Sequence, residues 1–137
     1  MFTFRLVVRF RDIDALNHVN NSVYLTYLEE CRIAYMRETQ IGSMGQPEQG
    51  TILARCEIDY RYPAILGDEL EVRMHVGDIR SSSFQFLYSM IRLRDDKLIA
   101  QAMTVQVCYN YVIGTPVRIP LAWREQLQAG QSPVQHN

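Results

Sequence analysis

The chain has 137 residues, which suits a single domain, and its 14 basic and 15 acidic side chains nearly balance. This balance excludes the strongly basic surface that nucleic acid or an anionic membrane would require. Three widely spaced cysteines without a CxxC pair, and three scattered histidines, predict neither a disulfide framework nor a metal site. No apolar run reaches the roughly 18 residues of a membrane span. We therefore expect a cytoplasmic protein without a cofactor.

Residues 2–10 are apolar and partly β-branched, so they predict a strand, and a polar, irregular segment follows at 12–21. An amphipathic helix of about four turns is predicted next, with Asn21 or Ser22 as its N-cap. Glu29, Glu30 and Arg32 fall off its apolar stripe and are expected to face solvent. The stripe at helical spacing consists of Val23, Tyr24, Tyr27, Leu28, Cys31, Ala34 and Tyr35.

Alternating apolar and polar residues predict four further strands, at 52–60, 70–76, 84–90 and 98–112. The first is expected to be half-buried. Turns are predicted at Gly67-Asp68, between Gly77-Asp78 and the serines at 81–83, and at 94–96, and a short helix at 121–127. The apolar row expected to share one face of the last strand contains Ile99, Met103, Val105, Val107, Tyr109 and Tyr111.

This order of elements predicts an α+β domain at 1–130, followed by a frayed tail at 131–137. An antiparallel sheet of about five strands would bury the stripe of the long helix by curling around it. Such a sheet keeps unpaired edges and a second face, and pairing with another copy would protect them. We therefore expect a homodimer or a homotetramer.

The groups that could act in catalysis are concentrated in the polar segment before the long helix. The first residues of a helix expose unpaired N–H groups with a partial positive charge, which suits an oxyanion or a polarised carbonyl. Asp14 precedes the helix by about seven residues and could act on the same carbonyl as a base or nucleophile. A thioester suits this arrangement because its thiol, with a pKa near ~8.5, leaves without a strong general acid. Asp12 is an alternative base, since it would point the same way in an extended segment.

The run from Asp14 through His18-Val19-Asn20-Asn21 resembles the D-x-x-x-H-V-N-N signature of hotdog-fold thioesterases. It is most similar to the acyl-CoA thioesterase branch of the 4-hydroxybenzoyl-CoA thioesterase family. The similarity continues over 24–32, over 60–63, at Gly67-Asp68 and over 80–83. It implies the hotdog fold, a sheet wrapped around one long central helix, and dimers whose active site lies at the subunit interface.

The same resemblance implies individual roles. Asp14 would be the catalytic carboxylate, the polarising backbone amide would fall at Asn21, and His18 and Asn20 would orient the loop or the thioester. The aromatic-substrate members carry glycine three residues after the aspartate, where this chain has Asn17, which favours aliphatic acyl groups of medium or long chain.

Coenzyme A carries three phosphates and seeks arginine, so Arg61, Arg80 and Arg94 near strand ends are candidate contacts. Ser82 and Ser83 could add hydroxyls and amides, and Tyr24 is either a core aromatic or a lining residue of an acyl tunnel. Two alternatives stay open: a hotdog-fold enoyl-CoA hydratase or dehydratase, which pairs a histidine with an aspartate, and a non-catalytic acyl-thioester binding protein.

Overall fold

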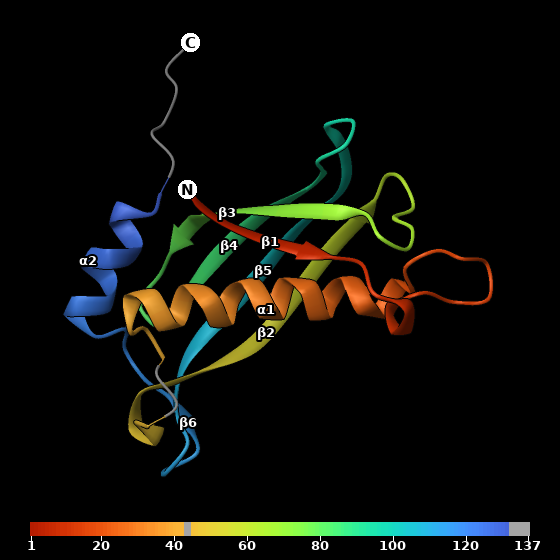
Figure 1. The fold of residues 1–137 in the computed structure, drawn as a ribbon. Coiled ribbons are helices and arrows are strands. Elements are labelled where there is room, and N and C mark those ends of the chain that lie inside the picture. The colour runs from red at the N-terminus through yellow and green to blue at the C-terminus, as the bar shows by residue number, and fades with distance from the viewer. Residues whose placement is uncertain (43–44, 132–137) are drawn as a thin grey trace.

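The computed structural model describes residues 1–42 and 45–131. Its main sheet has the strand order β1-β3-β4-β5-β2, every neighbouring pair is antiparallel, and a short strand β6 pairs with the end of β5 (Figure 1). The elements are β1 (Phe2–Val7), α1 (Asn21–Thr39), β2 (Gly50–Tyr60), β3 (Glu69–Ile79), β4 (Ser83–Arg92), β5 (Lys97–Asn110), β6 (Thr115–Pro116) and α2 (Leu121–Ala129), with 3-10 turns at Phe10–Asp12 and Pro47–Gln49.

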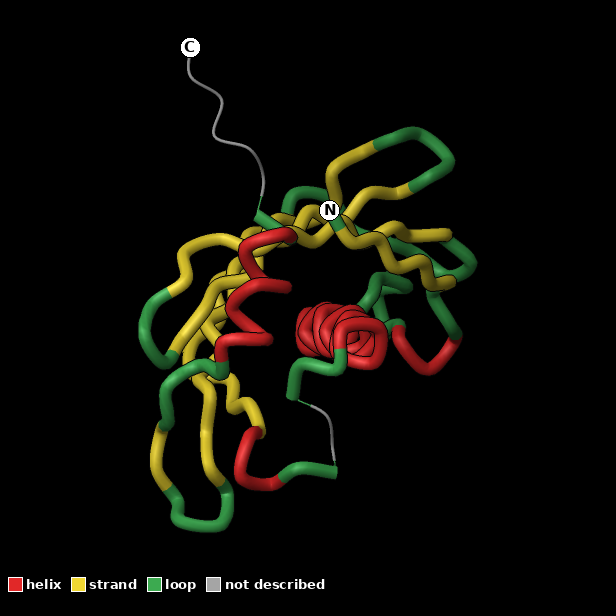
Figure 2. The backbone as a smooth tube through the Cα atoms, turned by 90° about the vertical axis from the view of Figure 1, so that its left-hand side faces the viewer, coloured by secondary structure: helices red, strands yellow, loops and turns green. Residues whose placement is uncertain are grey.

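The sheet curls around α1, as the sequence predicts, and α2 lies on the same side beside the C-terminal half of α1 (Figure 2). Side chains from α1 meet the inner faces of β3 and β4 in one apolar core. The frayed tail predicted from 131 onward lies, apart from Gln131, outside the described residues. In the described part of the chain no helix is both long and apolar enough to cross a membrane.

Helix α1 is longer than predicted, at 19 residues, and its N-cap lies one residue before Asn21, the earlier of the two predicted caps. Its N-cap is Asn20, whose extended backbone lets the side-chain oxygen accept from the Ser22 amide at 3.0 Å. The predicted stripe is confirmed at its centre, where Tyr27, Leu28 and Cys31 are almost fully buried. The prediction for Arg32 was wrong. Its side chain is buried, because it reaches inward to β4 rather than outward to water.

Two features of the strands were not predicted. The buried row of β5 contains Thr104, Gln106 and Cys108. The apolar row predicted to share one face is half-buried on the outer face, apart from Ile99, which is buried, and Tyr111, which lies beyond the strand and is exposed. Pairing with the buried Phe84 and Phe86 of β4 imposes this register. Gly77-Asp78 and 81–83 flank the turn between β3 and β4, as predicted, but Gly77-Asp78 is itself still part of β3. It lies within β3 at an irregularity, where a β-carbon on residue 77 would come within 2.8 Å of the Gln85 side chain.

Strand β2 is an edge of the sheet and is less buried than predicted. Ile52 and Leu53 are 42% and 47% exposed, and the pairing with β5 shifts by a bulge between Leu53 and Arg55. Only Gly50 is buried on this strand, and Thr51, Cys56 and Ile58 are half-buried. Eleven residues of β2 therefore offer a long, partly apolar edge to another chain.

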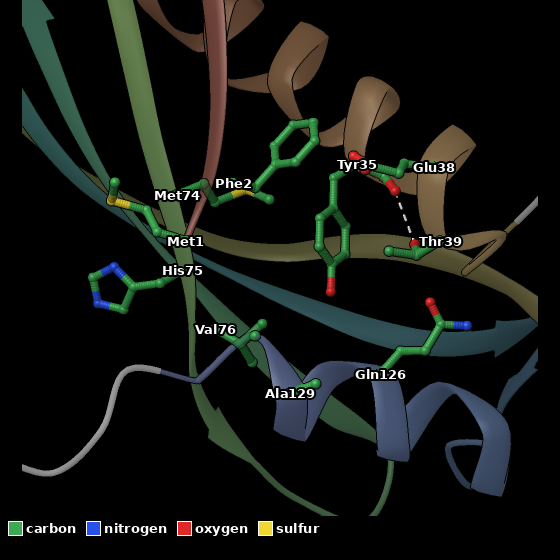
Figure 3. A pocket seen from close by; sticks show the side chains of 11 residues that line it. Met1, Phe2, Tyr35, Glu38, Thr39, Met74, His75, Val76, Gln126 and Ala129 are labelled. Atoms are coloured by element: carbon green, nitrogen blue, oxygen red, sulfur yellow. Dashed lines mark hydrogen bonds between the residues drawn. The ribbon is translucent and has the colours of Figure 1, made fainter.

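The largest cavity of the described chain, about 390 Å³, lies between α1, β3 and α2 and contains none of the predicted site residues (Figure 3). The ring of Tyr35 packs edge-on against Phe2 and Phe86, and its hydroxyl points toward the space beside Gln126. That hydroxyl is buried and has no hydrogen-bond partner among the described residues. Burial raises the pKa of Tyr35 to about 12, so the hydroxyl stays protonated.

Replacing Tyr35 with phenylalanine is therefore expected to leave the free energy of unfolding unchanged or to raise it by about 1 kcal/mol, because an unsatisfied buried hydroxyl is lost while the ring contacts stay. The matched control is Tyr88→Phe, which removes bonds to Thr104 and Arg32 and should cost about 1–2 kcal/mol. Urea unfolding measures both. Equal destabilisation by the two changes would contradict the interpretation.

Candidate active site

The segment that carries Asp14 is a tight, internally bonded turn. The Oδ1 atom of Asp14 accepts from the amides of Leu16 at 2.9 Å and His18 at 3.4 Å. The backbone closes the same turn, because the Asp14 amide donates to the His18 carbonyl at 2.8 Å. Asp14 itself is exposed, and its second oxygen, Oδ2, accepts no hydrogen bond from the described residues. The carboxylate is thus held by one oxygen and available through the other.

Asn17 stands at the point of this turn with φ +63°, in the left-handed region. Glycine adopts this conformation freely, and asparagine tolerates it better than most other residues. The chain therefore forms the turn with asparagine where related sequences carry glycine. From the sequence, Asn17 was expected to favour aliphatic acyl groups. Because asparagine forms the same turn, its presence alone does not favour aliphatic over aromatic substrates.

The start of α1 leaves one backbone amide unused. The Ser22 amide is capped by the Asn20 side chain, and the Val23 amide donates to the Asn20 carbonyl at 2.9 Å. The Asn21 amide donates to no residue in the described ranges. Asn20 thus fixes the helix start, and the adjacent Asn21 presents the free N–H group at the positive end of the helix dipole.

A cavity of about 360 Å³ brings five of the predicted site residues together: Asp14, His18, Asn21, Tyr24 and Arg61. The Tyr24 hydroxyl lies at its inner end, where it accepts from the Ala64 amide at 3.1 Å, and burial raises its pKa. The remaining walls were not predicted and come from Leu16, Val19, Tyr60, Tyr62 and Pro63. Three of these lie in the 60–63 segment that resembles the family. That resemblance was the signal in the sequence that could have identified them as wall residues. The Tyr60 hydroxyl donates to the Asn21 carbonyl at 3.0 Å and so ties this segment to the helix start.

Asp12, the alternative base, is occupied elsewhere. Its carboxylate is buried and accepts from the Arg9 amide at 3.0 Å and from the Tyr27 hydroxyl at 2.8 Å. Burial and the neighbouring carboxylate together raise the pKa of Tyr27, which keeps the hydroxyl a donor. Asp12 therefore joins the loop to α1, and the geometry favours Asp14 as the exposed carboxylate.

The predicted residues Arg80, Ser82 and Ser83 do not join this cavity. They occupy the turn between β3 and β4, at the opposite end of the sheet, because each of these strands is ten or eleven residues long. Arg80 and Ser83 line a separate cavity of about 200 Å³, and the Ser82 carbonyl accepts from the Cys108 amide. Within one chain these residues therefore lie apart from Asp14, and their contact with coenzyme A stays a prediction.

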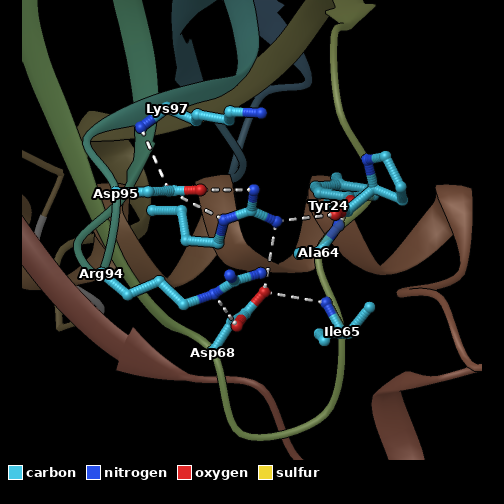
Figure 4. A network of polar contacts seen from close by, with 9 residues as sticks. Tyr24, Ala64, Ile65, Asp68, Arg94, Asp95 and Lys97 are labelled. Carbon is cyan, nitrogen blue, oxygen red and sulfur yellow. Dashed lines mark hydrogen bonds and ion pairs between the residues drawn. The ribbon is translucent and has the colours of Figure 1, made fainter.

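A buried ionic network that the sequence did not reveal supports the wall of the cavity (Figure 4). Arg92 binds both oxygens of Asp95 at 3.0 and 2.9 Å, donates to the Pro63 carbonyl at 3.2 Å and lies 3.6 Å from Asp68. Arg94, a predicted contact for coenzyme A, instead pairs with Asp68 at 3.0 Å. The hydrogen bond from Arg92 lowers the pKa of Asp95 to about 2.

This network holds residues 63–65 between the loop and the helix. The Ala64 carbonyl accepts from the Val19 amide at 2.9 Å, and Ile65 forms a bridge with His18. The Asp68 carboxylate accepts from the Ile65 amide at 3.0 Å. The 63–65 segment is thus a strap that joins the charged network, the Asp14 loop and Tyr24.

Comparisons with known proteins agree with this geometry. The sequence model of the thioesterase-like superfamily matches residues 8–129. The chain belongs to this superfamily. It is 24% identical, over 96% of its length and 97% of the relative, to a 1,4-dihydroxy-2-naphthoyl-CoA hydrolase of Gloeothece citriformis. It is 26% identical to the long-chain acyl-CoA thioesterase FadM of Escherichia coli, over 90% and 95% of the two chains.

The fold agrees with solved structures as well. A 1,4-dihydroxy-2-naphthoyl-CoA thioesterase from Synechocystis superposes with a TM-score of 0.86 at 21% identity, over 96% of this chain and 98% of the other. The predicted hotdog fold and the predicted thioester hydrolase are both confirmed. Within the described ranges no group of three or more potential ligands is placed to hold a metal ion.

Arg92→Met is expected to lower the free energy of unfolding by about 3 kcal/mol, because it leaves Asp68 and Asp95 without their shared buried cation. Arg94→Met is the matched control. Its side chain is 55% exposed, so its loss should cost about 1 kcal/mol or less. Thermal or urea unfolding measures both. A loss for Arg94→Met as large as that for Arg92→Met would show that the exposed pair, rather than Arg92, holds the strap.

Proposed function

We propose that the chain hydrolyses acyl-CoA thioesters in the cavity between Asp14 and the start of α1, with aliphatic acyl groups of medium or long chain as substrates. The observation that carries this proposal is that an exposed carboxylate and an unused helix-start amide line one cavity. Its relatives act on different acyl groups, one on a dihydroxynaphthoyl-CoA and one on long-chain acyl-CoA, so the substrate class must come from the chain itself.

Asp14 acts as the base for a water molecule or as the nucleophile itself. In the first route the water oxygen bonds to the carbonyl carbon, its proton passes to Asp14, and the C–S bond breaks to release coenzyme A as a thiolate. In the second route an Asp14 oxygen bonds to the carbonyl carbon and the C–S bond breaks to release coenzyme A as a thiolate, after which water hydrolyses the acyl anhydride to the free acid and the Asp14 carboxylate. Both routes place negative charge on the carbonyl oxygen, and the Asn21 amide stabilises it from the end of the helix.

A hydratase is less well supported by the same geometry. That reaction pairs a histidine ring with an aspartate, whereas Asp14 contacts His18 only through the backbone amide. His18 lines the cavity, and its carbonyl closes the Asp14 turn, so its role is to orient the loop. Asn20 orients the helix start in the same way.

The aliphatic preference rests on the shape of the groove between α1 and β2. A second cavity of about 140 Å³ lies farther along this groove, lined in part by Leu25, Leu28 and Leu53. Tyr24 and Tyr60 line the first cavity and meet edge-on, with ring centroids 5.3 Å apart. An extended alkyl chain fits beside these two rings more readily than a fused ring does.

A homodimer completes the binding site in this proposal. Ser83 pairs with Val107, and Val107 pairs with Ile52, so the β3–β4 turn lies at the Gly50 end of edge strand β2. Antiparallel pairing of two β2 strands reverses one copy, which brings that end beside the Tyr60 end of the other. Arg80, Ser82 and Ser83 of the partner subunit then lie on the same side of the joined sheet as Asp14 and Arg61, where they bind coenzyme A.

Asp14→Asn is expected to lower kcat on decanoyl-CoA by about 10²–10⁴-fold, the usual effect of losing a general base. Stability should change little, because an amide oxygen still accepts the two loop bonds. Release of free thiol measures the rate, and benzoyl-CoA in the same assay tests the aliphatic preference. Asp12→Asn is the control, and it should reduce stability rather than chemistry. Full activity of Asp14→Asn would refute the proposed role of this carboxylate.

The shared site predicts complementation between two impaired variants. Arg80→Ala should raise KM for acyl-CoA about tenfold, the effect of one charged contact. When Asp14→Asn and Arg80→Ala are mixed and allowed to exchange subunits, half of the dimers become mixed, and one of their two sites is intact. Activity should then recover to about a quarter of the wild-type value. Absence of recovery in a mixture shown by mass to contain mixed dimers would exclude a shared site.

A further inference from the structure

Arg32 is a buried cation without an anionic partner. Its residue is 7% exposed, and its one hydrogen bond within the described chain is from Nη1 to the Tyr88 hydroxyl, at a long 3.4 Å. It forms no ion pair with any residue at 1–42 or 45–131. A buried guanidinium is costly unless an acceptor or an anion compensates it. Its remaining N–H groups make no hydrogen bond with the described residues and are available to a ligand.

A second buried donor lies on the same polar part of the inner sheet face. The Tyr88 hydroxyl shares a 2.7 Å hydrogen bond with Thr104, which is fully buried on β5. Gln106 is two residues farther along the same face and 2% exposed, and its Nε2 atom has no partner among the described residues. Arg32 and Gln106 thus both present donors in a core that is otherwise apolar.

The cavity beside Arg32 is the second one of the groove between α1 and β2. Leu28, Leu53, Arg32 and Cys56 are among the residues that line it. Arg32 follows Asn21 by eleven residues, which places it roughly 16 Å farther along the helix axis. This distance corresponds to an extended medium-chain acyl group that starts at the Asn21 amide.

We propose that Arg32 determines substrate specificity by binding a carboxylate at the far end of the acyl group, so that the preferred substrates are acyl-CoA thioesters of dicarboxylic acids. A guanidinium recognises a carboxylate through two parallel hydrogen bonds, and the bound carboxylate neutralises the buried charge. Glu29 also lines this cavity, but it is exposed to solvent and forms no ion pair with Arg32. This inference rests on the proposed thioesterase function.

The first test compares decanedioyl-CoA with decanoyl-CoA, which differ in the terminal carboxylate. Wild-type protein should show a higher kcat/KM for decanedioyl-CoA. Arg32→Met should lower that value about 10- to 100-fold, the effect of one charged hydrogen-bonded contact, and leave decanoyl-CoA unchanged or improved. Arg32→Lys should restore part of the preference. The same ratio of the two substrates in wild type and Arg32→Met would overturn the inference while the thioesterase function stands.

Arg37→Met is the matched control, because it removes the same charge from an exposed position on the same helix. It should leave the ratio of the two substrates unchanged. Size-exclusion chromatography with light scattering of Arg32→Met tests whether Arg32 instead pairs with a second subunit. Dissociation of this variant, with equal loss of activity on both substrates, would overturn the specificity role.

A binding measurement separates failure of this inference from failure of the proposed function. Decanoate should raise the melting temperature of wild type and of Arg37→Met but not of Arg32→Met, and decanol should raise none of them. If wild type releases no thiol from either substrate yet shows this pattern, the carboxylate site stands and the hydrolysis proposal fails. Absence of a decanoate shift in wild type would overturn the carboxylate site directly.

Discussion

The structure depends on the burial of one face of α1 against the inner side of the curled sheet. Tyr27, Leu28 and Cys31 are almost fully covered there, and each buried apolar side chain of this size contributes roughly 1.5–3 kcal/mol. Because the helix is held along its length, its first turn is fixed at the end of the groove where the polar loop begins. The position of the Asn21 amide is therefore a consequence of core packing rather than of the loop alone.

Polar contacts then fix the loop and the cavity wall that surround the start of α1. The strap at 63–65 receives Arg92 from one side and bonds Tyr24 and Val19 on the other, so the cavity wall and the Asp14 turn are parts of one bonded unit. Asp12 serves the same purpose from the loop side through Tyr27. The exposed carboxylate of Asp14 thus stands on a rigid support, which is what an oriented base or nucleophile requires.

Local patterns predicted the order of the elements, the long helix, most of its stripe and the segment that carries the chemistry. They failed where a choice depended on neighbours distant in the sequence. The alternation in β5 is compatible with either face inward, and pairing with Phe84 and Phe86 selected the polar row. Arg32 was expected to face solvent because charged side chains usually do. Its guanidinium instead lies inside, where it donates to the Tyr88 hydroxyl on β4. Arg80 and Asp14 lie in separate cavities of one chain, a separation that depends on the length and pairing of the strands between them.

By itself the sequence determined the residues of the Asp14 loop, the left-handed position that asparagine tolerates and the cap that starts the helix, because these depend on neighbours within a few positions. Tertiary structure alone decided whether Asp12 or Asp14 is exposed, which arginines are buried, and which cavity the start of α1 lines. Those outcomes depend on packing between segments 40 or more residues apart, such as Tyr24 with Ala64 and Arg32 with Tyr88. Burial and hydrogen-bond partners, rather than residue type alone, decide which charged side chains are occupied within the fold and which are available at a cavity.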